Sequence, residues 1–182
     1  MRMIGLRSFP TTRGEQFDEA SFDALFRECV TDVHGYALSL LGERAAAEDV
    51  TALAFERLFR ARRRIDARRG TPRSLLFTIA RNAALDELRR RRRQPLALPA
   101  AEILATAPAT EAEDVERRES VRGALAELTP REREIVLLKF HGQLTNAELA
   151  QALGISESNA GTRLHRALTR LRESPLATEE IA

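Results

Sequence analysis

The sequence contains no tryptophan, one cysteine, one tyrosine and one lysine, and aromatic residues make up only 5% of its 182 residues. The single cysteine, Cys29, excludes an internal disulfide and a zinc site built from several cysteines. No apolar run approaches the roughly 18 residues of a membrane-spanning helix, and residues 1–17 have no apolar core of the secretory type. We therefore expect a cytoplasmic protein without membrane insertion, with an N-terminal arm over residues 1–17.

The usual signatures of catalysis are missing as well. His34, His141 and His165 lie far apart in the sequence, and none has a metal-ligating partner at a useful spacing. There is no glycine-rich phosphate-binding loop. Cys29 falls on the apolar stripe of a helical pattern, which favours a buried thiol in the core. The sequence predicts a protein that is not an enzyme and that uses no cofactor and no metal.

What the sequence does have is arginine, concentrated in one block. Residues 60–93 contain thirteen arginines and three acidic residues, a net charge of +10, whereas residues 101–127 carry a net charge of −4. A basic block of this kind is typical of a surface that binds a polyanion, and a solvated charged face is the alternative. Its candidates for nucleic-acid contact include Arg73, Arg81, Asn82 and Arg89.

The spacing of apolar residues predicts three helices in the first half. They cover residues 21–41, residues 45–61, and a segment that starts at Thr71-Pro72 and runs into the five arginines Arg89–Arg93. A short segment around Asp18–Ala20 leads into the first helix, and residues 62–70 form a basic loop. Residues 95–117 hold three prolines and no clean period, so they are predicted to be a linker. The first domain therefore spans residues 18–94.

The second half, residues 118–173, has unusually complete helix signals. They are the capping boxes Thr129-x-x-Glu132 and Thr145-x-x-Glu148, the helix stop Gly154 and the cap Ser156. Two short helices separated by Gly-Ile-Ser are the helix-turn-helix pattern. The predicted fold is all-α: two small helical domains joined by a flexible linker, the second a helix-turn-helix domain, followed by a tail over residues 174–182.

In a helix-turn-helix motif, the start of the second helix enters the major groove of DNA. The residues in this part of the pattern are Ser156, Glu157, Ser158, Asn159, Thr162 and Arg163, with Arg166 one turn beyond. Arginine can pair with guanine and asparagine with adenine, so these residues are the predicted sequence readers. A helix-turn-helix used only for protein contact is the alternative.

The predicted helix over residues 45–61 has an unusual outer face. Asp49, Leu53, Glu56 and Arg60 lie opposite its apolar stripe. A leucine among charged residues indicates a protein partner, although single exposed leucines are common.

Two long segments, "SLLFTIARNAALDELRRRRR" and "ALAELTPREREIVLLKFHGQLTNAELAQALGISESNAGTRLHRALTRLR", resemble the extracytoplasmic-function sigma factors of bacterial RNA polymerase, in the sigma-70 family. The resemblance covers roughly residues 21–173. It implies that the first domain binds the clamp helices of the largest polymerase subunit and captures the melted −10 element of a promoter. It implies that the second domain reads the −35 element and contacts the polymerase flap. An anti-sigma factor is a further partner that the family leads us to expect.

Position by position, the resemblance implies roles for individual residues. Polymerase contacts fall on Asp49, Ala52, Leu53 and Glu56. Contacts to −10 DNA fall on Arg68, Arg69, Arg73, Arg81, Asn82, Asp86, Arg89 and Arg90. Residues 62–71 would form the loop that receives a flipped base. The chain departs from the family's pattern at Ala52-Leu53, where the family often has Gln-Glu, and at Gly161, where it often has lysine.

Two other functions stay open at this point. The chain could be a conventional helix-turn-helix regulator that binds duplex DNA without being a polymerase subunit, or an adaptor that uses its helices for protein contact. Both predict no promoter-dependent transcription when the chain is added to core polymerase.

Overall fold

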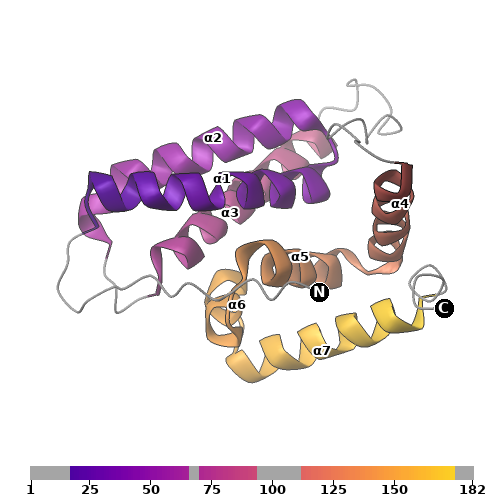
Figure 1. Ribbon diagram of the computed structural model, residues 1–182. Coiled ribbons are helices and arrows are strands. Elements are labelled where there is room, and N and C mark those ends of the chain that lie inside the picture. Colours follow the sequence, from indigo (N-terminus) through magenta and orange to yellow (C-terminus); the bar gives the residue numbers. More distant parts are fainter. Residues whose placement is uncertain (1–16, 66–69, 94–111, 175–182) are drawn as a thin grey trace.

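The computed structural model describes residues 17–65, 70–93 and 112–174 (Figure 1). Residues 1–16 of the predicted arm, residues 95–111 of the linker, Arg68, Arg69 and the tail from residue 175 lie outside the described residues. The described chain is all-α, as predicted. Its helices are α1 (Glu19–Leu41), α2 (Arg44–Ala61), the 3₁₀ turn η1 (Arg62–Arg64), α3 (Pro72–Arg93), α4 (Ala112–Glu127), α5 (Pro130–Gly142), α6 (Asn146–Leu153) and α7 (Glu157–Glu173).

The helices of the first half begin and end at residues suited to those positions. Asp18 caps α1 by accepting a hydrogen bond from the Ser21 amide at 2.8 Å, so the predicted short leading segment is part of α1. Gly42 ends α1 with φ 71, a left-handed conformation that glycine adopts without strain. Thr71 accepts a hydrogen bond from the Ser74 amide at 3.1 Å at the start of α3. Helices α1, α2 and α3 pack against one another.

The helix caps predicted for the second half are present in the structure. Both capping boxes are formed, with Thr129 before α5 and Thr145 before α6. Ser156 accepts from the Asn159 amide at the start of α7, and Gly154 ends α6 with φ 66. Helix α4 begins at Ala112, inside the segment predicted as linker. The α6–turn–α7 unit is the predicted helix-turn-helix.

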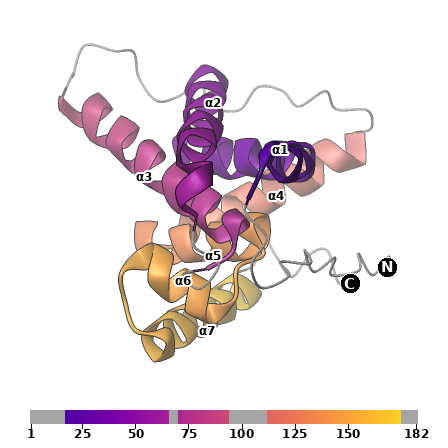
Figure 2. The ribbon, with the colours of Figure 1, turned by 90° about the vertical axis from the view of Figure 1, so that its left-hand side faces the viewer.

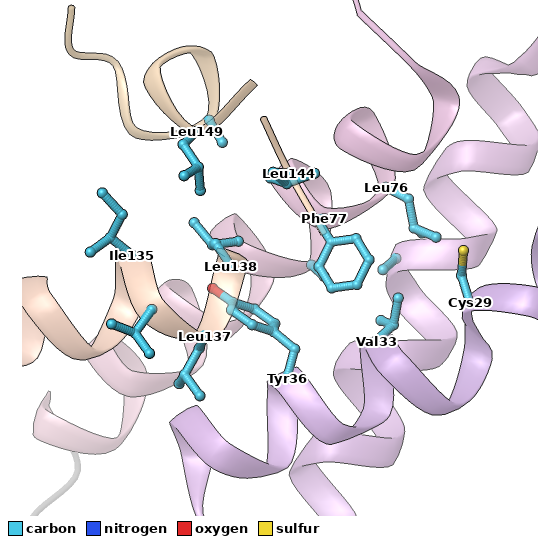
Figure 3. Packing of buried hydrophobic residues seen from close by; sticks show 14 of the residues in the cluster. Cys29, Val33, Tyr36, Leu76, Phe77, Ile135, Leu137, Leu138, Leu144 and Leu149 are labelled. Atoms are coloured by element: carbon cyan, nitrogen blue, oxygen red, sulfur yellow. The ribbon is translucent and has the colours of Figure 1, made fainter. Parts of the chain in front are cut away.

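One hydrophobic core joins the two halves. Figures 1 and 2 show α1 and the first turns of α3 lying against α5 and α6. Figure 3 shows the side chains that meet there: Val33, Tyr36 and Phe77 from the first half, and Leu137, Leu138, Leu144 and Leu149 from the second. All seven are at most 3% exposed. Burial of this apolar surface favours the closed packing of the two halves.

Arg73 makes the densest set of polar contacts between the halves. Its Nε donates to the Gly142 carbonyl at 2.7 Å, and one terminal nitrogen donates both to Asp32 at 2.6 Å and to the His141 carbonyl at 2.9 Å. Its other terminal nitrogen lies 3.0 Å from the sulfur of Cys29. Burial raises the pKa of the Cys29 thiol to about 11, so this thiol stays protonated at neutral pH. Arg73 thereby ties α1, α3 and the end of α5 together.

Two further polar contacts between the halves lie on either side of Arg73 along the chain. The hydroxyl of Thr71 donates to Glu148 at 2.7 Å, which connects the start of α3 with the capping box of α6. Further along α3, Arg81 Nε lies 2.9 Å from a carboxylate oxygen of Glu134 on α5. Both side chains of this ion pair are largely buried, at 18% and 11% exposure. Polar contacts to the second half therefore extend from Thr71, just before α3, through Arg73 to Arg81.

The halves also approach closely where Gly35 of α1 meets His141 of α5. A Cβ atom on Gly35 would lie 2.9 Å from Cε1 of the imidazole, closer than unstrained packing allows. The ring is packed against the backbone of α1 because position 35 has no side chain. A side chain at position 35 would therefore require the His141 ring to move.

Acidification is expected to weaken this packing. Burial lowers the pKa of His141 below its ordinary value of 6.5, while Asp32 on α1 acts in the opposite direction. The unfolded chain therefore takes up a proton at His141 near pH 6.5 that the folded chain does not, so the free energy of unfolding falls as pH drops below about 6.5.

The measurement is the thermal unfolding temperature of wild type and of His141→Gln at about pH 7.5 and about pH 5.5. We expect the larger decrease in wild type, because glutamine does not titrate. Equal decreases in the two proteins would contradict a role for His141.

Candidate nucleic-acid and polymerase interfaces

The start of α7 presents the predicted reading residues to solvent. Ser156, Glu157, Ser158, Asn159, Thr162 and Arg166 are exposed, and Arg163 is half-buried. The apolar positions Ala160, Leu164 and Ala167 face the core, which orients the polar positions outward. The hydroxyl of Thr162 donates to the Ser158 carbonyl at 2.9 Å, leaving its methyl group and oxygen at the surface. The geometry of a groove-reading helix is therefore present.

Arg163 is held in place by Asn159. Its Nε donates to the Asn159 side-chain oxygen at 2.9 Å, one helical turn away. This bond restricts the guanidinium group and leaves its two terminal nitrogens for other acceptors. A guanidinium fixed in this way can pair with the two acceptors of a guanine edge. The spacing of four residues is the sequence signal for this pair.

Arg170 lies towards the end of α7, and its side chain contacts α5. It donates to Glu132 at 2.9 Å, and the same carboxylate completes the capping box of α5. The bonds from Thr129 are the main cause of the lowered pKa of Glu132, with Arg170 adding to it. Arg170 therefore joins α7 to the start of α5.

One face of α3 carries four of the residues predicted to contact −10 DNA. Asn82, Asp86, Arg89 and Arg90 follow one another at helical spacing, and all are exposed. Arg89 donates to Asp86 at 2.7 Å, so these two side chains form an exposed pair. The face combines hydrogen-bonding groups with positive charge, as protein surfaces that bind nucleic acid do.

Glu87 holds two members of the arginine run. Its carboxylate accepts two hydrogen bonds from Arg90, at 2.7 and 2.8 Å, and one from Arg91 at 2.8 Å. These bonds lower the pKa of Glu87 to about 2. Arg91 also donates to Glu43 at 2.6 Å and contacts the Leu41 carbonyl at 3.4 Å. Arg91 thus secures the turn between α1 and α2, a structural role that the charge count did not predict.

The residues predicted to contact −10 DNA fall into a largely buried group and an exposed group in the structure. Arg73 and Arg81 lie on the face of α3 that contacts α1 and α5, and their side chains are 12% and 18% exposed. Arg81 also donates to the Asn82 side-chain oxygen at 3.3 Å, so it contacts the exposed group at that one residue. Glu134, the partner of Arg81, was not among the predicted residues. The sequence does contain a signal for Glu134, which lies four residues before the buried Leu138 and so on the same apolar face of the helix. An acidic side chain on such a face needs a partner.

The face of α2 predicted to bind polymerase is exposed at Asp49, Ala52 and Glu56. Glu56 pairs with Arg60 at 2.7 Å. Leu53 is only half-buried and packs against a small apolar cluster that includes Val50 of α2 and Ala83 of α3. It lines a shallow groove between α2 and α3 together with Asp49, Arg57, Asp86 and Arg90. The predicted polymerase face and the predicted DNA face of α3 therefore meet along one groove.

Among the described residues, no group of three or more His, Cys, Asp or Glu side chains is arranged to hold a metal ion. None of the helices there is both long and apolar enough to span a membrane.

Comparison with known proteins finds similarity over both halves. Residues 25–94 match the family Sigma-70 region 2, and residues 118–171 match Sigma-70, region 4. The chain is 30% identical to the ECF RNA polymerase sigma factor SigL of Mycobacterium tuberculosis, covering 85% of this chain and 89% of that protein. It is 32% identical to the RNA polymerase sigma factor CarQ of Myxococcus xanthus, covering 84% of this chain and 88% of that protein.

A solved structure has the same fold. It is the sigma factor RpoE of Bartonella quintana, in complex with the anti-sigma factor NepR, with a TM-score of 0.68. Sequence identity is 20%, and the match covers 84% of this chain and 95% of the other. CnrH, in complex with the cytosolic domain of CnrY, matches with a TM-score of 0.62 and 21% identity.

Proposed function

Because the chain belongs to the extracytoplasmic-function sigma factors of the sigma-70 family, we propose that its exposed helix faces bind core RNA polymerase and the two elements of a promoter. The family supports the role of a transcription initiation factor over that of a regulator acting without polymerase. The proposed role is non-catalytic, and its place is the cytoplasm, where polymerase works.

The observation that carries the proposal is the groove between α2 and α3. It places Leu53 and Asp49, proposed to contact the polymerase clamp helices, beside Asp86 and Arg90, proposed to contact the −10 strand. A protein seated on α2 would hold melted DNA against α3 across this groove. Strand opening is assisted when extruded bases find stacking and hydrogen-bonding partners on the protein. Arg68 and Arg69, outside the described residues, are proposed to extend this surface.

The second half supplies the upstream contact. The exposed start of α7 is proposed to enter the major groove of the −35 element, with Asn159 and Arg163 contacting base edges. Arg166, exposed one turn further, is proposed to contact a phosphate. The polymerase flap would fix the distance between the two DNA-binding faces.

An anti-sigma factor is proposed as a regulatory partner. Two solved proteins with the same fold each have a protein partner: RpoE is in complex with the anti-sigma factor NepR, and CnrH is in complex with the cytosolic domain of CnrY. We propose that this chain is controlled by a protein of the same class.

The experiment that tests the function is a run-off transcription assay. Purified chain and core polymerase are mixed with a pool of random-sequence templates, and transcripts are sequenced. We expect transcripts that start downstream of a shared pair of elements. If adding the chain gives no more transcription than core polymerase alone, the proposal is contradicted. A regulator or an adaptor is then favoured.

Replacing the arginine at the start of α7 is expected to relax sequence preference. Arg163→Ala removes the guanidinium that Asn159 orients, so one base pair of the upstream element should lose about 1–3 kcal/mol of discrimination. The measurement is transcription from templates randomised at the upstream element. The matched control is Arg172→Ala, which removes the same charge from the exposed last turn of α7. An equal loss of transcription from every template would reject base reading by Arg163.

A further inference from the structure

We propose that Glu87 is a positioning residue for capture of the −10 strand: its carboxylate, fixed from one side by Arg91, holds the guanidinium of Arg90 at the groove between α2 and α3. The inference rests on the proposed function, since it takes over the assignment of Arg90 to the −10 strand. Glu87 is not among the residues predicted to contact DNA, and its role is exerted through Arg90.

Arg90 and Glu87 form a pair with two parallel hydrogen bonds. Nε and one terminal nitrogen of Arg90 donate to the two different oxygens of Glu87, at 2.7 and 2.8 Å. Two such bonds fix the plane of a guanidinium group as well as its distance, which a single bond does not. They leave the second terminal nitrogen of Arg90, with its two N–H groups, for an outside acceptor.

The exposure of the two side chains differs. The side chain of Arg90 is 64% exposed, whereas that of Glu87 is 16% exposed. An isolated ion pair at a surface contributes little, because ordering two long side chains offsets their attraction. Here the acid is sheltered by the protein and the arginine is open to a ligand, so the pair can order Arg90 without covering it.

Glu87 is fixed by the rest of the fold through Arg91. The oxygen of Glu87 that accepts from the terminal nitrogen of Arg90 also accepts from Nε of Arg91 at 2.8 Å. Arg91 in turn donates to Glu43 at 2.6 Å and to the Leu41 carbonyl at 3.4 Å. A chain of polar contacts therefore runs from the turn between α1 and α2, through Arg91 and Glu87, to Arg90.

Arg90 is held where the two proposed binding faces meet. Arg90 and Glu87 both line the groove between α2 and α3, together with Asp86 of α3 and Leu53 of α2. A guanidinium group that is already ordered binds a strand more tightly than a free one, because binding then removes less side-chain entropy. For one long side chain this difference corresponds to about 2- to 10-fold in affinity.

The negative charge of Glu87 acts against DNA in general. The bonds from Arg90 and Arg91 lower the pKa of Glu87 to about 2, so it is ionised at neutral pH. Its charge pairs a positive charge that could otherwise neutralise a phosphate. Glu87 therefore lowers non-specific attraction while it orders Arg90, and these two effects have opposite signs.

The first measurement uses the free full-length chain. NMR relaxation gives the order parameter of the Arg90 Nε–H group in wild type and in Glu87→Gln, which keeps the size of the side chain and removes its charge. We expect a rigid group in wild type and an order parameter below about 0.6, the range of flexible groups, in Glu87→Gln. A mobile Arg90 in wild type would overturn the inference. Arg91 keeps its bonds to Glu43 and Leu41 in this variant, so the fold is expected to persist.

The second measurement uses holoenzyme, assembled from full-length chain and core polymerase, on a promoter selected in the run-off assay. The equilibrium constant for strand opening at saturating DNA should fall about 2- to 10-fold in Glu87→Gln. The affinity of free chain for a single strand of random sequence should rise, and its dependence on log salt should steepen by up to about 0.7. The matched control is Glu173→Gln, which removes the same charge from the exposed last turn of α7 and should leave strand opening unchanged.

A double-mutant cycle separates positioning from a structural role. In an Arg90→Ala chain, Glu87 has no guanidinium left to hold, so Glu87→Gln should no longer change strand opening. An equal fall with and without Arg90 would show that Glu87 acts through the fold and would overturn the inference. A rise in strand opening together with the rise in affinity would overturn it too, since charge alone would then be acting.

Failure of this inference and failure of the proposed function give different results. If no template supports run-off transcription, the proposed function is rejected, and the NMR measurement still decides whether Glu87 holds Arg90. If transcription occurs and Glu87→Gln leaves strand opening unchanged, the positioning role alone is rejected.

Discussion

The closed arrangement of this chain depends on the guanidinium group of Arg73. Helix α5 ends inside the protein, so its last carbonyls need donors, and Arg73 supplies them from α3 while pairing with Asp32 of α1. Gly35 lets the same end of α5 approach α1 closely. Around this point the apolar side chains of both halves form one core. The position of each functional face follows from that packing.

Local sequence signals predicted the helices well, because spacing, caps and stops are properties of neighbouring residues. Thr129, Thr145 and Ser156 all act as the predicted caps. The contact between the halves was not predicted, because it joins residues far apart in sequence across a segment read as a linker. For the same reason, charge alone grouped Arg73 and Arg81 with the exposed arginines of α3. Their burial depends on partners in the other half.

The arginine run illustrates how one residue type serves different ends within five positions. Arg89 forms an exposed pair with Asp86, and Arg90 is held by Glu87 at the edge of the groove. Arg91 is structural, bridging Glu87 to the turn between α1 and α2. The final two arginines, Arg92 and Arg93, are exposed. Contact with another part of the fold, rather than position in the run or an acidic partner, separates the structural Arg91 from the arginines that can meet DNA.

The most direct test of the account is whether the two halves share a core in the free protein. Leu138→Ala removes a buried side chain of α5 that packs in the cluster with Tyr36 and Phe77. The measurement is native-state hydrogen exchange of wild type and variant, resolved by helix. A shared core predicts that amides of α1 and the first turns of α3 lose protection together with those of α5. Loss confined to α5, α6 and α7 would contradict it.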